Sequence, residues 1–125
     1  MTKEIFLSGM TADQLKAEAD TELDNIAAMG LNTVFLQVRP SADALYPSEL
    51  FPWSRYVSGT AGQAPNGSFD ALGYWVTAAH ERGLQLHAWI NPYRITIDGE
   101  DEWNAIPDSS PAKQHPEWVV KYNDN

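Results

Sequence analysis

The spacing of apolar residues predicts a helix over residues 11–29. Thr11 and Gln14, three positions apart, match a capping box, in which each side chain satisfies an otherwise unpaired backbone donor. Gly30 follows at the position where helices commonly end in a left-handed residue. The apolar residues that share one face of this helix are Leu15, Ala19, Leu23, Ile26 and Ala27.

A second helix is predicted to run from Asp70, a good N-cap residue, to Arg82, with Gly83 as its stop. Its apolar residues again recur at helical spacing, so one side of the helix is expected to be buried. The residues expected on that side are Leu72, Trp75, Val76 and Ala79.

Each predicted helix leads into a run of β-branched and apolar residues that ends at a proline. Both runs, residues 33–39 and 84–91, are predicted to be strands. The order helix, strand, helix, strand is typical of an α/β fold with a parallel sheet. The nearly continuous apolar character of residues 33–39 suits a parallel strand that is covered on both faces.

The connection between the first strand and the second helix, residues 40–69, is unusually long. Such connections commonly have about 2–6 residues, and a much longer one is more often functional than accidental. A flexible linker would not contain this many aromatic residues. The loop is therefore expected to pack as a lid or wall beside the strand ends. The loop holds the aromatic residues Tyr46, Phe51, Trp53 and Tyr56.

Residues 95–125 are predicted to form a polar, acidic tail. The acidic run over residues 98–102 lacks the remaining pattern of a calcium loop, so it is interpreted as solvated charge. Ser110 and Pro111 are expected to start a short helical turn, because proline is favoured at the first helical position.

Composition narrows the class of protein. The 125 residues suffice for one domain, and the net charge of −9 disfavours binding to nucleic acid or to anionic membranes. The longest apolar stretches have only a few residues, so no membrane insertion is expected. Because the chain has no cysteine, disulfides, thiolate zinc sites and a cysteine nucleophile are excluded.

Polar side chains gather where the two predicted strands end. Side chains alternate across a strand, and ligands of α/β folds bind beyond the carboxyl ends of parallel strands. Unpaired burial of such groups would cost about 1–3 kcal/mol each, so they are expected to meet one another, water or a ligand. The candidate ligand-binding residues on the strands and the loops that follow are Gln37, Arg39, Asp43, Tyr46, Trp53, His87, Trp89, Asn91, Tyr93 and Arg94.

Structural roles compete with this interpretation for several candidates. Arg39 can pair with Asp43, and Gln37 can serve as a structural hydrogen-bonding group. His87 lies in the middle of its strand, where a histidine is more often a satisfied core residue than a ligand contact. Tyr46 and Trp53 can simply pack the long loop. These alternatives remain open at the level of sequence.

No cofactor and no metal are expected. The three histidines, His80, His87 and His115, have no ligand-like spacing. No glycine-rich phosphate loop follows either strand, and no serine lies in a nucleophile-elbow motif.

A series of short motifs follows in order along the chain. They are residues 30–34 (GLNTV), 37–40 (QVRP), 43–48 (DALYPS), 52–54 (PWS), 59–60 (GT), 80–84 (HERGL), 87–94 (HAWINPYR), 111–112 (PA) and 115–118 (HPEW). Together they resemble the glycosyl-hydrolase-like family 10 over residues 12–122. The resemblance implies a bacterial protein, often envelope-attached or secreted, with a (β/α)8 barrel that acts on glycans, so carbohydrate is the implied partner.

The resemblance also implies that residues 1–125 are a single fragment of a TIM-type barrel. A complete barrel takes about 250 residues, and the two predicted strands match the second and third strands of the family. The first strand of the family would precede Met1, and residues 5–7 resemble the loop that follows it. The expected fold is therefore α/β, a partial barrel with two strands and their helices.

The implied activity is hydrolysis of O-glycosidic bonds in a bacterial or environmental polysaccharide. That reaction needs two carboxyl groups. At these strand ends Asp43 is the only catalytic candidate, and it is a weak one. The fragment is therefore expected to be inactive alone. Two alternatives are a carbohydrate-binding barrel without catalysis and a fragment that self-associates through exposed strand edges.

Overall fold

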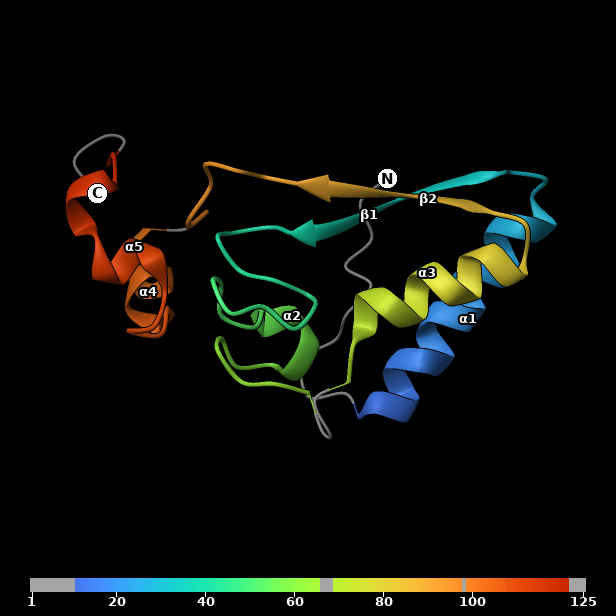
Figure 1. The fold of residues 1–125 in the computed structure, drawn as a ribbon, viewed down its shortest axis with the longest axis horizontal. Helices are drawn as coiled ribbons and strands as arrows, with labels where there is room; N and C mark the ends of the chain where they lie inside the picture. Colours follow the sequence, from blue (N-terminus) through green and yellow to red (C-terminus); the bar gives the residue numbers. More distant parts are fainter. Residues whose placement is uncertain (1–10, 66–68, 98, 122–125) are drawn as a thin grey trace.

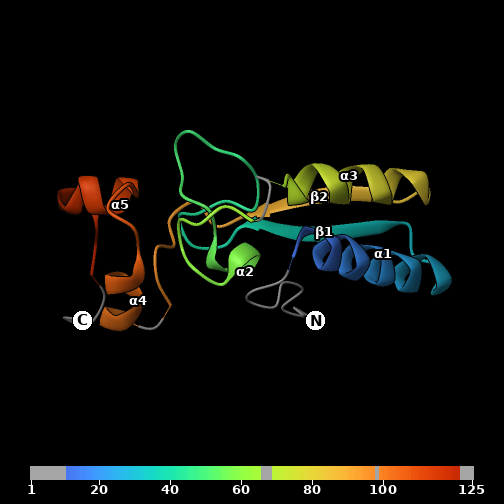
Figure 2. The same cartoon turned by 90° about the horizontal axis from the view of Figure 1, so that it is seen from below.

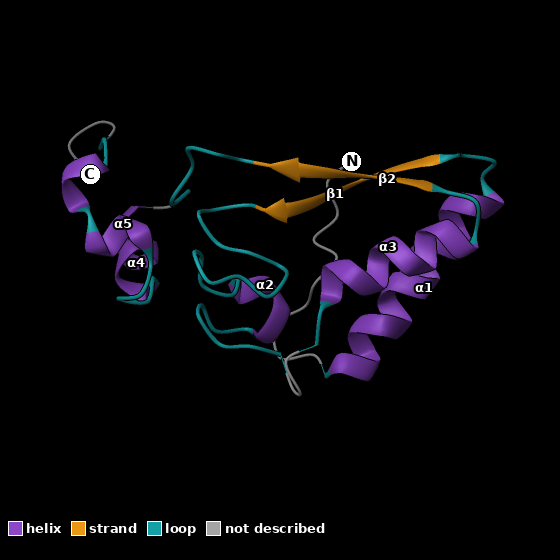
Figure 3. Cartoon of the chain, viewed as in Figure 1, coloured by secondary structure: helices purple, strands orange, loops and turns teal. Residues whose placement is uncertain are grey.

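Two helix–strand units follow each other in a computed structural model, which describes residues 11–65, 69–97 and 99–121 (Figure 1). The alternation of helix and strand agrees with the prediction, and Figure 3 shows it by colour. Residues 5–7, which were compared with a family loop, lie outside the described residues. The four elements are α1 (Ala12–Ala28), β1 (Thr33–Arg39), α3 (Ala71–Glu81) and β2 (Gln85–Ile90).

Local side-chain caps define where the helices begin. The Thr11 hydroxyl accepts a hydrogen bond from the Gln14 N–H at 3.2 Å, and Gln14 Oε1 accepts one from the Thr11 N–H at 2.8 Å. Asp70 caps α3 by accepting from the Gly73 N–H at 2.9 Å. The predicted capping box and N-cap are thus confirmed. Gly30 follows α1 with a φ of +75°, a conformation that favours glycine.

The two strands pair in parallel along their whole length. The register runs from Thr33 beside Gln85 to Gln37 beside Trp89, and then shifts by one residue so that Arg39 lies beside Ile90. The irregularity leaves one extra residue in β1 near its carboxyl end. Parallel pairing brings the carboxyl ends of both strands to the same edge of the sheet.

Both long helices lie on one side of the sheet, as Figures 1 and 2 show from two directions. Three alternate residues of β1 are buried there, and Leu36 and Val38 are each only 2% exposed. The prediction that this strand is covered on both faces is wrong, because Phe35 on the opposite face is 68% exposed. The core against the helices comprises Leu15, Leu23, Val34, Leu36, Val38, Trp75 and Leu84, among others.

The buried side of α3 differs from the predicted one. Trp75 and Ala79 are buried as expected, but Ala71 and Ala78 take the places assigned to Leu72 and Val76, which are only partly buried. The reason is that α3 contacts α1 as well as β2, so its buried side lies between two neighbours. In α1, Leu15, Ala19 and Leu23 are buried, Ile26 is partly buried and Ala27 is exposed.

The loop over residues 40–69 contains a short helix, α2 (Arg55–Ser58). Ser54 is its N-cap, and Gly59 ends it with a φ of +90°. Leu45 and Val57, on either side of Ser54, belong to the hydrophobic core. The described part of the loop is therefore packed against the helix–strand layers (Figure 2).

The segment after β2 lies beyond the carboxyl ends of the strands (Figure 1). It contains α4 (Gly99–Ala105), α5 (Pro111–Gln114) and the 3-10 turn η2 (Pro116–Trp118). The predicted turn with a proline at its first position is confirmed, whereas α4 was not predicted. Among the described residues, no helix has the length and apolar character needed to cross a membrane.

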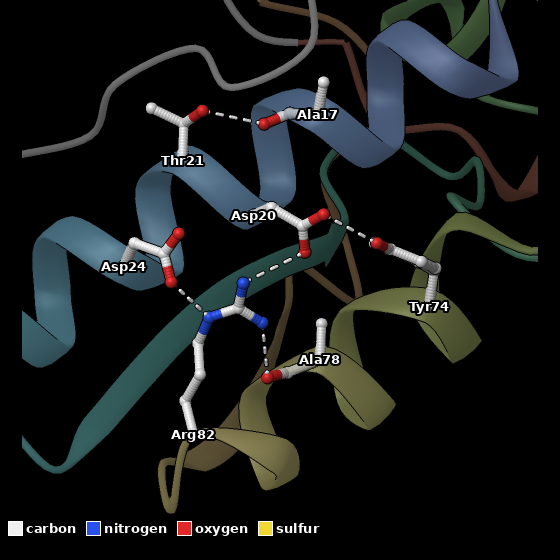
Figure 4. Close-up of polar contacts among 7 residues, drawn as sticks. All are labelled: Ala17, Asp20, Thr21, Asp24, Tyr74, Ala78 and Arg82. Carbon is white, nitrogen blue, oxygen red and sulfur yellow. Dashed lines mark hydrogen bonds and ion pairs between the residues drawn. The ribbon is translucent and has the colours of Figure 1, made fainter.

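An ionic clamp joins α1 to α3, in which Arg82 is the central group (Figure 4). Its guanidinium donates to Asp24 at 2.6 Å, to Asp20 at 3.2 Å and to the Ala78 carbonyl at 3.0 Å. The Tyr74 hydroxyl donates to the second oxygen of Asp20 at 2.8 Å, and this hydrogen bond raises the pKa of Tyr74. The clamp fixes how the two helices lie on the sheet.

We predict that Arg82→Gln lowers the free energy of unfolding by about 1 kcal/mol, because it removes two ion pairs between the helices. Urea unfolding followed by circular dichroism measures the change. Lys121→Gln, which removes the same charge from an exposed position, is the control and should have no effect. Equal stability of the two variants would contradict a structural role for the clamp.

Candidate functional site

Two side chains that follow β2 converge on the backbone carbonyl that follows β1. The Pro40 oxygen accepts hydrogen bonds from Asn91 Nδ2 at 3.2 Å and from Arg94 Nε at 3.0 Å. The Asn91 N–H donates to the Arg39 carbonyl at 2.9 Å, and Trp89 Nε1 donates to Asn91 Oδ1 at 3.0 Å. Four of the sequence-predicted site residues are therefore brought together at the carboxyl edge of the sheet. In this arrangement the Asn91 amide braces the two strand ends.

Arg39 lies at the same edge but has a different environment from the expected one. The carbon at the centre of its guanidinium lies 3.8 Å from the centroid of the Phe51 ring. Its Nε is buried and has no hydrogen-bond partner. No ion pair joins Arg39 to Asp43 among the described residues, so the alternative that these two pair with each other is wrong.

Asp43 is held by its own loop. Its carboxylate accepts from the Ser41 N–H at 2.9 Å, and Ala42 between them has a φ of +52°, a strained value for a residue with a Cβ. Burial raises the pKa of Asp43, although the Ser41 N–H, the Ser54 hydroxyl and the positive charge of Arg55 act in the opposite direction. The protonated form of this carboxyl is therefore favoured relative to a solvated aspartic acid.

A cleft lies between the long loop and the segment around α4. Arg55 of α2 and Glu102 of α4 form an ion pair across it at 2.6 Å. A Cβ added to Gly62 would lie 2.9 Å from Pro107 Cγ, so the two segments are in close contact beside the cleft. The lining residues are Ser41, Ala42, Asp43, Pro52, Trp53, Arg55, Tyr56, Ala61, Ile95, Glu102, Ala105, Ile106 and Pro107.

Arg55 and Glu102 are residues that sequence reasoning missed. Glu102 lies in the acidic run interpreted as solvated charge, but its side chain is only 13% exposed. The interpretation fails at this position because an ion pair between residues so far apart leaves no local pattern. The sequence offered one signal for the ion pair, because Arg55 is the only basic residue in the loop over residues 40–69.

The uncovered face of the sheet carries further candidates. The rings of Phe35 and His87 lie with their centroids 5.0 Å apart, and His87 is exposed, so it is not the satisfied core histidine considered as an alternative. Gln37 lies beside Trp89 in the strand register. Trp89 is 44% exposed, so its indole is accessible on this part of the sheet.

The remaining three candidates occupy other positions. Tyr46 and Trp53 are partly buried and pack against the hydrophobic core, which agrees with the loop-packing alternative. Trp53 also lines the cleft. Tyr93 is 94% exposed, just after the carboxyl end of β2.

The described residues thus form an α/β unit with a polar edge at its parallel strand ends. The chain belongs to the family Glycosyl hydrolase-like 10, whose sequence profile matches residues 5–125. The resemblance found in its motifs is thereby confirmed.

Two relatives illustrate the similarity. Glycosyl hydrolase YngK of Bacillus subtilis (strain 168) is 41% identical over 114 residues, which are 91% of this chain and 22% of that protein. Glycosyl hydrolase DigH of Escherichia coli (strain K12) is 38% identical over 105 residues, which are 78% of this chain and 24% of that protein. The chain thus spans less than a quarter of the length of these relatives.

The raised pKa of Asp43 predicts how the stability of an Asp43→Asn variant depends on pH. A carboxyl with a raised pKa in the folded state stabilises the fold below its unfolded pKa of about 3.9, and this contribution is lost as the pH rises through the folded value. The variant, which can still accept from the Ser41 N–H, should match the unsubstituted chain near pH 3 and exceed its stability at pH 7.

Chemical unfolding at both pH values measures this difference. Asp108→Asn, which removes one negative charge at an exposed position, is the matched control. An Asp43→Asn variant that is less stable than the unsubstituted chain at pH 7 would show that the ionised carboxylate stabilises the fold, contrary to this account.

Proposed function

We propose that this chain forms a glycan-binding part of a glycoside-hydrolase-like enzyme that acts on O-glycosidic bonds of a bacterial or environmental polysaccharide. The observation that supports the proposal best is the convergence of guanidinium, amide and aromatic groups at the carboxyl ends of two parallel strands. Sugars are bound in proteins by hydrogen bonds to their hydroxyls and by contact of their apolar faces with aromatic rings. Both kinds of group are present at this edge.

We further propose that β1 and β2 are the second and third strands of a (β/α)8 barrel in a longer protein. The support is the arrangement of layers, since both helices lie on one face of the sheet and no described element covers the other (Figure 1). In a barrel, helices cover the outer face of the strands and the inner face meets side chains of other strands. The polar edge would then lie at the end of the barrel where active sites form.

The proposed roles follow from the environment of each group. Arg39 and Arg94 would donate hydrogen bonds to the sugar from their terminal nitrogens, and Trp89 and Tyr93 would offer ring faces. These contacts position the glycan and stabilise the transition state without transferring a proton. Gln37, His87 and Asn91 would support the site from the strands.

Asp43 is the proposed acid of the described site, because its burial favours a protonated carboxyl. Hydrolysis requires a second carboxyl group near the scissile bond. Glu102 lines the same cleft as Asp43, but its pairing with Arg55 commits it to a structural contact. The second catalytic carboxyl is therefore proposed to lie on another strand of the longer protein, and this chain alone is proposed to be inactive.

A carbohydrate-binding barrel without catalysis is the second candidate, and the absence of a second uncommitted carboxyl among the described strand-end residues favours it. The two candidates differ in the release of reducing ends. A reducing-sugar assay after incubation of the longer protein with polysaccharide distinguishes the two candidates. An enzyme produces new reducing ends, whereas a binding barrel leaves the glycan intact and produces none.

We predict that Arg39→Ala in the longer protein lowers kcat/KM by about tenfold to a hundredfold, because a hydrogen bond from a charged group is worth about 1.5–3 kcal/mol. The melting temperature should hardly change, since Arg39 has no ion-pair partner in the described residues. Arg82→Ala is the matched control and should show the opposite pattern. A large loss of stability with intact turnover in Arg39→Ala would make Arg39 structural.

The uncovered sheet face favours self-association of this chain by itself. On this face Phe35 is 68% exposed and Trp89 44% exposed, and exposed apolar sheet surfaces and unpaired strand edges promote pairing with a second chain. We predict that size-exclusion chromatography with light scattering detects dimers at high concentration. Phe35→Lys should yield monomers, whereas Leu50→Lys, at another exposed apolar residue, should not. A clean monomer of the unsubstituted chain would contradict self-association.

A further inference from the structure

The arginines of the chain fall into two groups according to their partners. Arg55 and Arg82 each form an ion pair with a carboxylate at 2.6 Å. Arg39 and Arg94 have no carboxylate partner among the described residues, and both lie at the carboxyl edge of the sheet. The chain has 17 acidic residues against 8 basic ones, so two arginines without carboxylate partners at one edge are notable.

The environment of Arg39 favours an anionic ligand over a neutral one. The Arg39 side chain is partly buried. Its Nε is buried and has no hydrogen-bond partner. Partial removal of the Arg39 guanidinium from water costs free energy, and no ion pair among the described residues offsets this cost. A hydroxyl of a sugar can accept a hydrogen bond, but only an anion can also balance the charge.

The geometry of the two guanidinium groups suits a carboxylate. The central carbon of the Arg39 guanidinium lies over the Phe51 ring, 3.8 Å from its centroid, and the N–H donors of a guanidinium lie in its plane. A guanidinium held in this way can bind a carboxylate through two parallel hydrogen bonds. Arg94 is fixed through its Nε, which donates to the carbonyl of Pro40, the residue after Arg39. Its terminal nitrogens have no partner among the described residues.

We propose that the glycan bound at this edge is acidic, and that Arg39 and Arg94 together recognise a carboxylate carried by a sugar unit. This inference rests on the proposed function, which it narrows to one substrate class. A single carboxylate also agrees with the overall charge of −9, since that charge would oppose binding of densely charged polyanions such as nucleic acid.

The test compares ligands whose carboxyl groups are either charged or neutralised by a methyl ester. Isothermal titration calorimetry of the 125-residue chain would use digalacturonate and a hyaluronan tetrasaccharide, each beside its neutral methyl ester. At least one acid is expected to bind about tenfold or more tightly than its ester, which is the effect of losing one charge-assisted hydrogen-bonded contact.

Variants then assign the preference to the two arginines. Arg39→Gln and Arg94→Gln should each lower the affinity for the acid about tenfold more than the affinity for the ester, so that the preference for the acid is lost. Circular dichroism spectra that match the unsubstituted chain show that the variants are folded. Lys121→Gln is the matched control, because it removes the same charge from an exposed position and should leave both affinities unchanged.

The outcomes separate this inference from the proposed function. Equal binding of acids and esters would overturn the acidic-sugar proposal and leave a glycan site at the strand ends. A loss of acid affinity in Lys121→Gln as large as in Arg39→Gln would also overturn it, because the preference would then reflect overall charge. Absence of binding by every acid and every ester would overturn both proposals.

Discussion

The parallel pairing of β1 with β2, covered by helices on one face only, is the constraint on which the rest of the structure depends. It places both carboxyl ends at one edge, where the Asn91 amide and Arg94 Nε bind the same Pro40 carbonyl. The Arg82 clamp between α1 and α3 holds the covering helices in place. Because none of the described elements covers the other face, aromatic and polar side chains are accessible beside the edge.

Two polar arrangements follow from this constraint, and they differ in charge. At the strand edge, Arg39 and Arg94 carry positive charge without a carboxylate partner among the described residues. In the adjoining cleft, Asp43 is partly buried, which raises its pKa, while the positive charge of Arg55 is balanced by Glu102. The edge is thus suited to recognising a ligand, whereas the cleft raises the pKa of a carboxyl group.

Local structure could be predicted from the sequence, whereas the choice of distant partners could not. The capping box of Thr11 and Gln14 depends on residues three positions apart, so its pattern is visible in the chain. The ion pair of Arg55 with Glu102 joins an unpredicted helix to the long loop and leaves no such pattern. Likewise, adjacency in sequence suggested that Asp43 pairs with Arg39, but the turn at Ala42 directs its carboxylate to the Ser41 N–H. Alternation along β1 identified the aliphatic face that the helices cover, although the nearly continuous apolar character of the strand also suggested a cover over the opposite face, where Phe35 is exposed.

The central claim is that the carboxyl edge of the sheet contacts a glycan. Amide and arginine side-chain chemical shifts, recorded by NMR while an acidic oligosaccharide is added to the isotope-labelled chain, test it most directly. The account predicts that the largest shifts occur at residues 37–41 and 89–94, including Nε–H of Arg39 and Arg94. Shifts confined to the outer surfaces of α1 and α3, or no shifts anywhere at saturating ligand, would contradict it.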